Sequence, residues 1–124
     1  MSFLLKNIDH VTIKTNNLTS IKNFYVNVLG LKVSKSRPNF KFKGVWLKLK
    51  NRSIIHVIET PKIIHKGDSI DHFAFKGISI KDTKKTLNKH SIRFFEQKTP
   101  DNKNAQIFLT DPDNNKIEIT FSLK

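Results

Sequence analysis

Three histidines and one glutamate stand at positions that the sequence repeats. Residues 8–14 (IDHVTIK) return as residues 70–76 (IDHFAFK), so that residue 10 corresponds to residue 72, an offset of 62. The same offset places His56 on Glu118 and Trp46 on Phe108. Imidazole and carboxylate are ligand types for divalent metal ions. The repeat therefore predicts a metal site made of His10, His56, His72 and Glu118.

Side-chain alternation supports the convergence of these four residues. Successive residues of a strand point to opposite faces of the sheet. Next to each candidate ligand, on one or both sides in the sequence, stands an apolar residue that must point to the opposite face. These apolar pairs are Val11 and Ile13, Ile55 and Val57, Phe73 and Phe75, and Ile117 and Ile119. The apolar face is expected to pack under a helix. The other face is expected to curve into a cup that holds the four ligands.

The ligand set restricts the chemistry. The chain has no cysteine, so only imidazole and carboxylate can bind the ion. Three imidazoles and one carboxylate suit one divalent ion: Mn, Fe, Co, Ni or Zn. A six-coordinate ion would keep open positions for a substrate with two adjacent oxygens and act as a Lewis acid. Glu118, partly released from the ion, is the predicted catalytic residue for proton transfer.

Four further residues are candidates for the substrate pocket. Arg37 is a candidate anion anchor near the cup rim, and Gln106, on a cup-side strand, a candidate substrate contact. Trp46 and its copy Phe108 are expected to line the cup, with plain core packing as the alternative for Trp46. The remaining ligand-type residues are expected outside the site. Glu59 is expected on the face of its strand opposite to His56. His65 and His90 have no ligand-type residue at the copied position and are predicted to be exposed.

Each copy reads as a strand, a helix and three strands. The first helix is expected to start at Asn16 or Asn17 and to end before Gly30, and the second to run from Ser79 to about Lys89. The predicted strands cover residues 7–14, 31–36, 41–49, 53–59, 70–76, 92–97, 105–110 and 116–121. The fold class is therefore α+β, with two tandem βαβββ modules forming a curved mixed-sheet cup. Module 1 covers about 7–60, a connector 61–68 and module 2 about 69–124, as a single domain 1–124.

Composition limits the classes of partner. The net charge of +13 would favour polyanions, but the lysines are spread along the whole chain and accompany no nucleic-acid recognition motif. A solvated lysine-rich surface is therefore favoured over a nucleic-acid interface. There is no apolar run of about 20 residues and no signal-peptide pattern. A soluble cytoplasmic protein that acts on a small molecule, without a membrane partner, is expected.

The sequence resembles the vicinal oxygen chelate superfamily of glyoxalases, bleomycin resistance proteins and extradiol dioxygenases. The similar segments are IDHV at 8–11, NFYVNVLGL at 23–31, IDH at 70–72 and DPDNNKIE at 111–118. The resemblance extends to a glyoxalase I-like branch and implies the glyoxalase/bleomycin resistance fold. It assigns His10, His72 and Glu118 as metal ligands. Glyoxalase I has a glutamate where this chain has His56, and the usual glycine of the Asp-Pro-Asp turn is Asn114 here.

The resemblance implies a metalloenzyme similar to lactoylglutathione lyase, a lyase or isomerase acting on a small carbonyl or hydroxycarbonyl compound. A metal-free small-molecule binding protein of the bleomycin-binding type is one alternative. A thiol transferase, which needs only three ligands, and a dioxygenase are others. Members of this fold often build the cup across a homodimer. The sequence leaves open the substrate, the ion, the use of glutathione or another thiol, and whether one chain or two complete the site.

Overall fold

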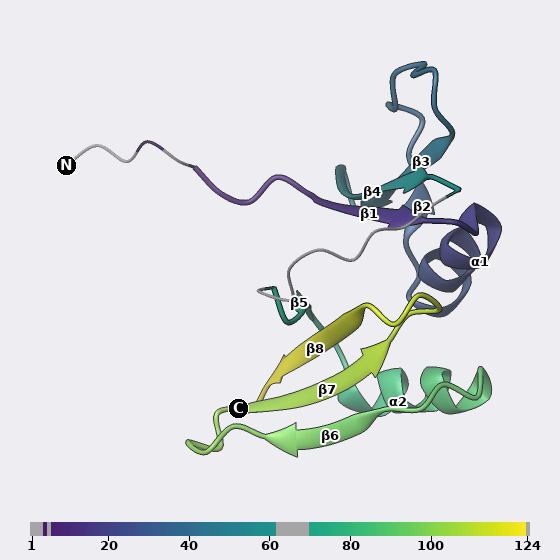
Figure 1. Cartoon of the computed structure of the whole chain (residues 1–124). Coiled ribbons are helices and arrows are strands. Elements are labelled where there is room, and N and C mark those ends of the chain that lie inside the picture. Colours follow the sequence, from purple (N-terminus) through teal and green to yellow (C-terminus); the bar gives the residue numbers. More distant parts are fainter. Residues whose placement is uncertain (1–3, 5, 62–69, 124) are drawn as a thin grey trace. The chain divides into compact units, whose positions relative to one another are not determined.

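The protein forms two compact units, Met1–Ile63 and Ile64–Lys124, in a computed structural model that describes residues 4, 6–61 and 70–123. Each unit holds one four-stranded mixed sheet and one helical segment (Figure 1). Unit 1 contains β1 (Val11–Thr15), α1 (Leu18–Asn23), the π-helix η1 (Phe24–Val28), β2 (Lys32–Val33), β3 (Gly44–Leu49) and β4 (Arg52–Glu59). Unit 2 contains β5 (Phe73–Lys76), α2 (Ile80–Lys89), β6 (Phe95–Lys98), β7 (Asn104–Thr110) and β8 (Lys116–Ser122).

The two sheets share one topology. Their strand orders are β1-β4-β3-β2 and β5-β8-β7-β6, with the first pair of each parallel and the others antiparallel. Trp46 lies opposite His56, and 62 residues later Phe108 lies opposite Glu118. The predicted tandem βαβββ fold is therefore confirmed, and the pairing of the third and fourth strands is the same in both units. The curved cup that would unite the two sheets stays a prediction.

The apolar residues of the inner strands form the cores of the units. Ile55 and Val57 of β4 are buried, as are Ile117 and Ile119 of β8. In unit 1 the helix α1 contacts β3 and β4, so the buried face of β4 is the face that the helix covers. Alternation then puts His56 on the opposite face, as the sequence predicts.

Both helices begin at the predicted caps. The side chain of Asn17 accepts a hydrogen bond from the backbone N–H of Ser20 at 3.0 Å, and Ser79 accepts one from Asp82 at 3.1 Å. Each cap satisfies a backbone donor that has no partner within the helix. At the other end, Gly30 has φ +82°, the left-handed conformation expected after a helix.

The first helical segment contains one residue more than the copied helix. In η1 the N–H of Leu29 donates to the carbonyl of Phe24, five residues back, so this turn is wider than an α-helical turn. The left-handed residue that follows is Gly30 in unit 1 and Ser91 in unit 2, which are 61 residues apart. The constant offset of 62 inferred from the sequence is therefore wrong around the helix end.

The extra residue carries through into the outer strand. Val33 pairs with Leu47 in unit 1, whereas Phe95, which is 62 residues after Val33, pairs with Phe108 and not with Leu109. A one-residue slip moves a strand's side chains to the other face. The copied geometry thus holds for the three strands that carry the candidate ligands and fails in the outer strand.

Several strands are shorter than predicted. Residues 7–10 precede β1, and the second strand covers only Lys32–Val33 in place of 31–36. The third begins at Gly44 in place of 41, and the sixth at Phe95 in place of 92. These segments have strand-like composition, but a strand needs a backbone partner as well. The predicted connector 61–68 lies outside the described residues except for Pro61.

Candidate metal and substrate site

Unit 2 brings two of the predicted ligands together. Nε2 of His72, just before β5, lies 2.9 Å from Oε1 of Glu118 on β8. The other ring nitrogen, Nδ1, donates a hydrogen bond of 2.8 Å to Oδ2 of Asp71. Such a hydrogen bond fixes the tautomer and the ring orientation of a histidine ligand. His72 therefore presents Nε2 beside the carboxylate of Glu118.

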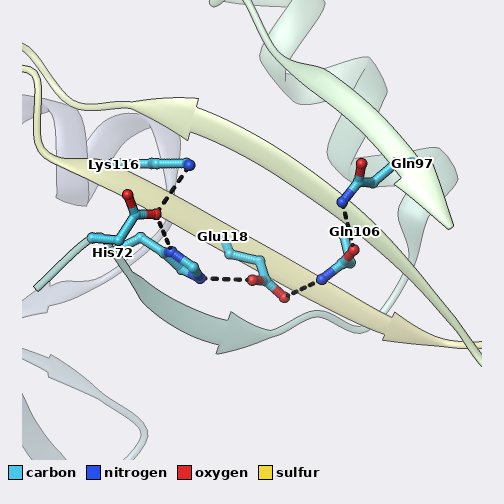
Figure 2. A network of polar contacts seen from close by, with 6 residues as sticks. His72, Gln97, Gln106, Lys116 and Glu118 are labelled. Atoms are coloured by element: carbon cyan, nitrogen blue, oxygen red, sulfur yellow. Dashed lines mark hydrogen bonds and ion pairs between the residues drawn. The ribbon is translucent and has the colours of Figure 1, made fainter. Parts of the chain in front are cut away.

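Glu118 is held by a chain of side-chain amides (Figure 2). Nε2 of Gln106 donates to Oε2 of Glu118 at 3.2 Å, and Nε2 of Gln97 donates to Oε1 of Gln106 at 2.9 Å. The glutamate side chain is only 12% exposed, and both its oxygens have a contact. Gln106, expected to contact substrate, here orients the candidate ligand.

The acid that orients His72 is held in its charged form. The hydrogen bond from His72 is the main cause that lowers the pKa of Asp71, and Lys116, whose Nζ lies 3.0 Å from Oδ2, is the second. Lys116 also lies 5.2 Å from the ring centre of Phe108, which meets the ring of His72 edge-on at 5.7 Å. Phe108 thus contacts a candidate ligand from the strand position predicted for it.

Unit 1 repeats the histidine half of this arrangement. Nδ1 of His10 donates to Oδ2 of Asp9 at 2.8 Å, the same contact that His72 makes with Asp71. This hydrogen bond is the main cause that lowers the pKa of Asp9. Nε2 is again the nitrogen left for an ion. His10 is more exposed than His72, at 36% against 32% of the side chain.

The fourth predicted ligand lies between two rings. The ring of His56 stacks on His10, with centroids 3.8 Å apart and planes 16° apart, and on Trp46, with centroids 3.8 Å apart and planes 5° apart. Burial, and then the neighbouring His10, lower the pKa of His56 below its ordinary value, so that the ring is neutral near pH 7. The imidazole is therefore the middle layer of a three-ring stack.

A polar pocket of about 290 Å³ lies beside this stack. Its lining residues are Asp9, Ser36, Trp46, Asn51, Arg52, Ser53 and His56. One guanidinium nitrogen of Arg52 donates to the carbonyl of Ile8 at 2.9 Å and to that of Asp9 at 3.4 Å, which anchors the side chain. Ser36 lies within hydrogen-bond distance of Ser53, at 3.4 Å. The pocket thus combines one guanidinium, one carboxylate, two hydroxyls, an amide, an imidazole and an indole face.

Arg37 lies elsewhere. Its Nη2 donates to the carbonyl of Phe42 at 2.9 Å, and its guanidinium lies 5.1 Å from the ring centre of Phe40 and 5.3 Å from that of Phe42. These contacts close the loop between β2 and β3, and Arg37 is not among the residues that line the pocket. Arg52 provides the pocket's guanidinium instead. Sequence reasoning missed Arg52 because it stands between the predicted strands 41–49 and 53–59.

The residues expected outside the site behave as follows. Oε2 of Glu59 accepts a hydrogen bond from the backbone N–H of Leu18 at 3.2 Å, at the start of α1, so this acid supports the helix. His90 is exposed, as predicted. His65 lies outside the described residues. The orienting acids Asp9 and Asp71 were not predicted as such, although the repeated Asp-His pair was the signal for them.

The donor set of unit 2 fits a divalent ion. Two donor atoms at about 2.1 Å from one ion and at right angles lie about 3 Å apart, close to the 2.9 Å between His72 and Glu118. Within the described part of each unit, these residues form pairs, and no group of three or more His, Asp or Glu side chains gathers as a metal site.

The comparisons with known proteins agree with this geometry. The family model of the glyoxalase/bleomycin resistance protein/dioxygenase superfamily matches residues 7–119. The chain belongs to this superfamily. The fold of two βαβββ modules is the one that its solved members share, so the resemblance noted in the sequence is confirmed.

Individual superfamily members are similar over nearly the whole chain. The metallothiol transferase FosB of Staphylococcus saprophyticus is 27% identical over 121 residues, which cover 94% of this chain and 77% of the relative. A glyoxalase family protein from Enterococcus faecalis has a TM-score of 0.76 at 26% identity and covers 95% of this chain and 99% of its own. The fosfomycin resistance protein FosX of Listeria monocytogenes has a TM-score of 0.76 at 15% identity, with 97% and 96% covered, and shows the fold alone.

Members of this superfamily often bind a divalent metal ion, and often act as dimers on small-molecule substrates. No helix among the described residues is long and apolar enough to cross a membrane.

Proposed function

We propose that this chain is a metal-dependent enzyme that adds a thiol to a small electrophile carrying adjacent oxygens. The observation that carries the proposal is the pair of His72 and Glu118, whose donor atoms lie 2.9 Å apart while Asp71 fixes the ring. The similarity to the metallothiol transferase FosB supports thiol transfer. His56 also supports thiol transfer. A lyase of the glyoxalase I type has a second carboxylate at the position of His56, and this chain has an imidazole there.

The proposed ion is Mn, Fe, Co, Ni or Zn, held by Nε2 of His10, Nε2 of His72 and Glu118. His56 is a fourth candidate by its copied position alone. The bound ion would supply Lewis acidity toward the substrate's oxygens. Asp9 and Asp71 would hold the two histidines in the tautomer that presents Nε2. Gln106 would keep the Glu118 carboxylate turned toward His72. The active form is proposed to be a homodimer.

The pocket of unit 1 is the proposed place of the second reactant. Its hydroxyls, its amide and the guanidinium of Arg52 suit a small thiol that carries a carboxylate, and Trp46 offers an apolar wall. In the transfer the sulfur forms a bond to an electrophilic carbon while a carbon–oxygen bond breaks, and the thiol proton passes to that oxygen. Because the pocket includes Asp9 and His56, it adjoins the proposed ligand His10.

The test is metal analysis of the purified protein followed by two assays. We expect one ion per site and metal-dependent consumption of cysteine or glutathione with fosfomycin as the electrophile. Arg52→Ala is expected to raise the KM for the thiol about tenfold with little change in kcat, since a hydrogen bond to a charged group contributes roughly 1.5–3 kcal/mol. Arg52→Lys is the matched control that keeps the charge.

The same preparation should be offered the methylglyoxal–glutathione adduct. Turnover of this adduct without thiol transfer would replace the transferase by the second candidate, a glyoxalase-like lyase or isomerase, in which Glu118 moves the proton. A chain that binds small ligands but no ion would make it a binding protein of the bleomycin-resistance type and refute both enzymes. The cytoplasm is the proposed location, since both thiol substrates are abundant there in reduced form.

A further inference from the structure

The environment of His56 differs from that of every other candidate ligand. Its ring is covered on one face by His10 and on the other by Trp46, each at 3.8 Å between centroids. The other two histidines each donate Nδ1 to a carboxylate: His10 to Asp9, and His72 to Asp71. His56 instead hydrogen-bonds to the backbone of Ser53, and a backbone carbonyl can also orient a metal ligand. The two ring contacts are therefore what distinguishes His56 from the other histidines.

The stack itself prevents His56 from sharing an ion with His10. The lone pair of an imidazole nitrogen lies in the plane of its ring. The two planes are nearly parallel, 16° apart, with centroids 3.8 Å apart. An ion bound to both would lie about 1.9 Å out of each plane, almost the whole length of a metal–nitrogen bond of about 2.1 Å. Both rings therefore cannot direct a lone pair at one ion in this arrangement.

We propose that His56 is a positioning residue, the middle ring of a His10–His56–Trp46 stack that fixes the orientation of His10, in place of the ligand role inferred from its copied position. Asp9 restrains His10 at Nδ1, and a hydrogen bond alone still permits the ring to swing about the contact. Stacking on its face removes that freedom.

Strand pairing explains why this stack forms. Trp46 of β3 lies directly opposite His56 of β4, which brings their side chains together on one face of the sheet. At the copied pair, Phe108 lies opposite Glu118, so the same backbone places an aromatic ring beside an acid. The fourth-strand position therefore supplies a ligand candidate in unit 2 and a ring spacer in unit 1.

The test compares two variants that differ in shape but both lack the imidazole nitrogens. His56→Phe keeps a flat ring in the stack, and His56→Ala removes it. Metal affinity is measured by chelator competition with Zn²⁺ and by Co²⁺ absorption, with His72→Ala as the loss-of-ligand reference. We expect His56→Phe to bind Zn²⁺ within about threefold of the unchanged protein and His56→Ala to bind roughly tenfold more weakly, the size of effect seen for outer partners of ligands.

Two outcomes would overturn the proposal. A loss in His56→Phe as large as in His72→Ala would make His56 a ligand. Unchanged affinity in both His56 variants would show that the stack positions nothing. Thermal unfolding identifies a variant that has lost its fold, and His56→Leu, which keeps the volume without a flat ring, then replaces His56→Ala with the same expected weakening.

The role of His56 toward the ion rests on the proposed function, and the stack can be tested without it. If the unchanged protein binds no ion, the proposed function fails, and ring-proton NMR still reports on the stack. The His56 ring protons are expected upfield of the exposed His90 protons, because aromatic faces cover them. Trp46→Leu should move them downfield. Protons that do not move on this change would show that the indole is not stacked there and would overturn the proposal.

Discussion

The same position of the fourth strand has opposite surroundings in the two units. In unit 1 it carries His56, whose ring stacks on those of His10 and Trp46. In unit 2 it carries Glu118, whose contacts are the polar atoms of His72 and Gln106. The backbone pairing around both residues is the same. The two units thus share one backbone arrangement at this position. The side chain there forms a ring stack in unit 1 and is a candidate metal ligand in unit 2.

The polar residues near this position differ between the two units as well. Asn51, Arg52 and Ser53 line the pocket of unit 1. The residues 62 positions later form the turn between β7 and β8, where Asn115 and the backbone hydrogen-bond to the buried carboxylate of Asp111. In the same turn, Oδ2 of Asp113 is buried and has no hydrogen-bond partner among the described residues. Substrate binding is proposed for unit 1 because the pocket that includes Arg52 lies there, and unit 2 holds the proposed ligand pair of His72 and Glu118.

The largest effect is expected from removing the charge that distinguishes the units. Glu118→Gln keeps the shape but replaces the carboxylate next to His72. Metal affinity should fall on the order of a hundredfold or more, with turnover lost, because a ligand is removed outright. Isothermal titration with Zn²⁺ measures this change. Gln106→Ala, which removes only a neighbour that holds Glu118, should cost about tenfold. Equal losses in the two variants would contradict the assignment of Glu118 as a ligand.

The sequence was sufficient to predict the fold, because both the repeat and the alternation of apolar residues along the strands can be read directly from it. They located the helices and the faces of β4 and β8, and they predicted that His72 and Glu118 share a face. The orienting role of Asp71 was readable from the repeated Asp-His pair, but parity alone does not show which atom a side chain contacts. The meeting of all four predicted ligands at one ion stays a prediction.

Other features depend on contacts that no local pattern encodes. Strand alternation places His56 on the sheet face opposite to the apolar core, as predicted. Its stacking on Trp46, however, depends on the ring angles of two side chains on neighbouring strands. Arg37 is near the predicted rim in sequence, but Phe40 and Phe42 bind its guanidinium within the loop. The wide turn of η1 adds a residue without any glycine or proline inside it to signal the change. The slip of the outer strand follows from that residue.

A smaller effect, on the free energy of unfolding, is expected at the helix ends. Each helix is followed by a residue in the left-handed conformation, and that residue differs between the units. Gly30 has φ +82° and Ser91 has φ +56°. A side chain in this conformation costs about 1 kcal/mol, and glycine avoids the cost. Gly30→Ala should therefore lower the free energy of unfolding by about 1 kcal/mol, and Ser91→Gly should raise it by up to about 1 kcal/mol.

Urea denaturation measures both changes. No atom outside the chain neighbours of Gly30 lies within 4 Å of an added Cβ, so a loss there reports backbone strain and not a clash. Ser91→Ala, which keeps a Cβ in the left-handed conformation, is the matched control for Ser91→Gly. Stabilisation by alanine equal to that by glycine would show that the serine hydroxyl, and not the backbone, carries the cost.

The smallest effect concerns the loops that precede β3 and β7. The loop in unit 1 is closed by Arg37 and two aromatic rings, whereas the loop in unit 2 is closed by hydrogen bonds to one acid. The hydroxyl of Thr99 donates to Asp101 at 2.6 Å and the backbone N–H of Lys103 donates at 3.0 Å. The Thr99 contact is the main cause that lowers the pKa of Asp101 below 3.8.

A lowered pKa in the folded state means that ionised Asp101 stabilises the fold. This contribution is complete above the unfolded-state pKa of 3.8 and is lost as the pH falls through the lower folded-state value. Asp101→Asn should therefore be less stable than the unchanged protein at pH 6, and the two should approach each other below pH 3.8. Urea midpoints at both pH values measure the difference, and Thr99→Val should reproduce most of it. A constant difference across the pH range would mean that the loop depends on the shape of the side chain and not on its charge, as the ring-closed loop of unit 1 is expected to do.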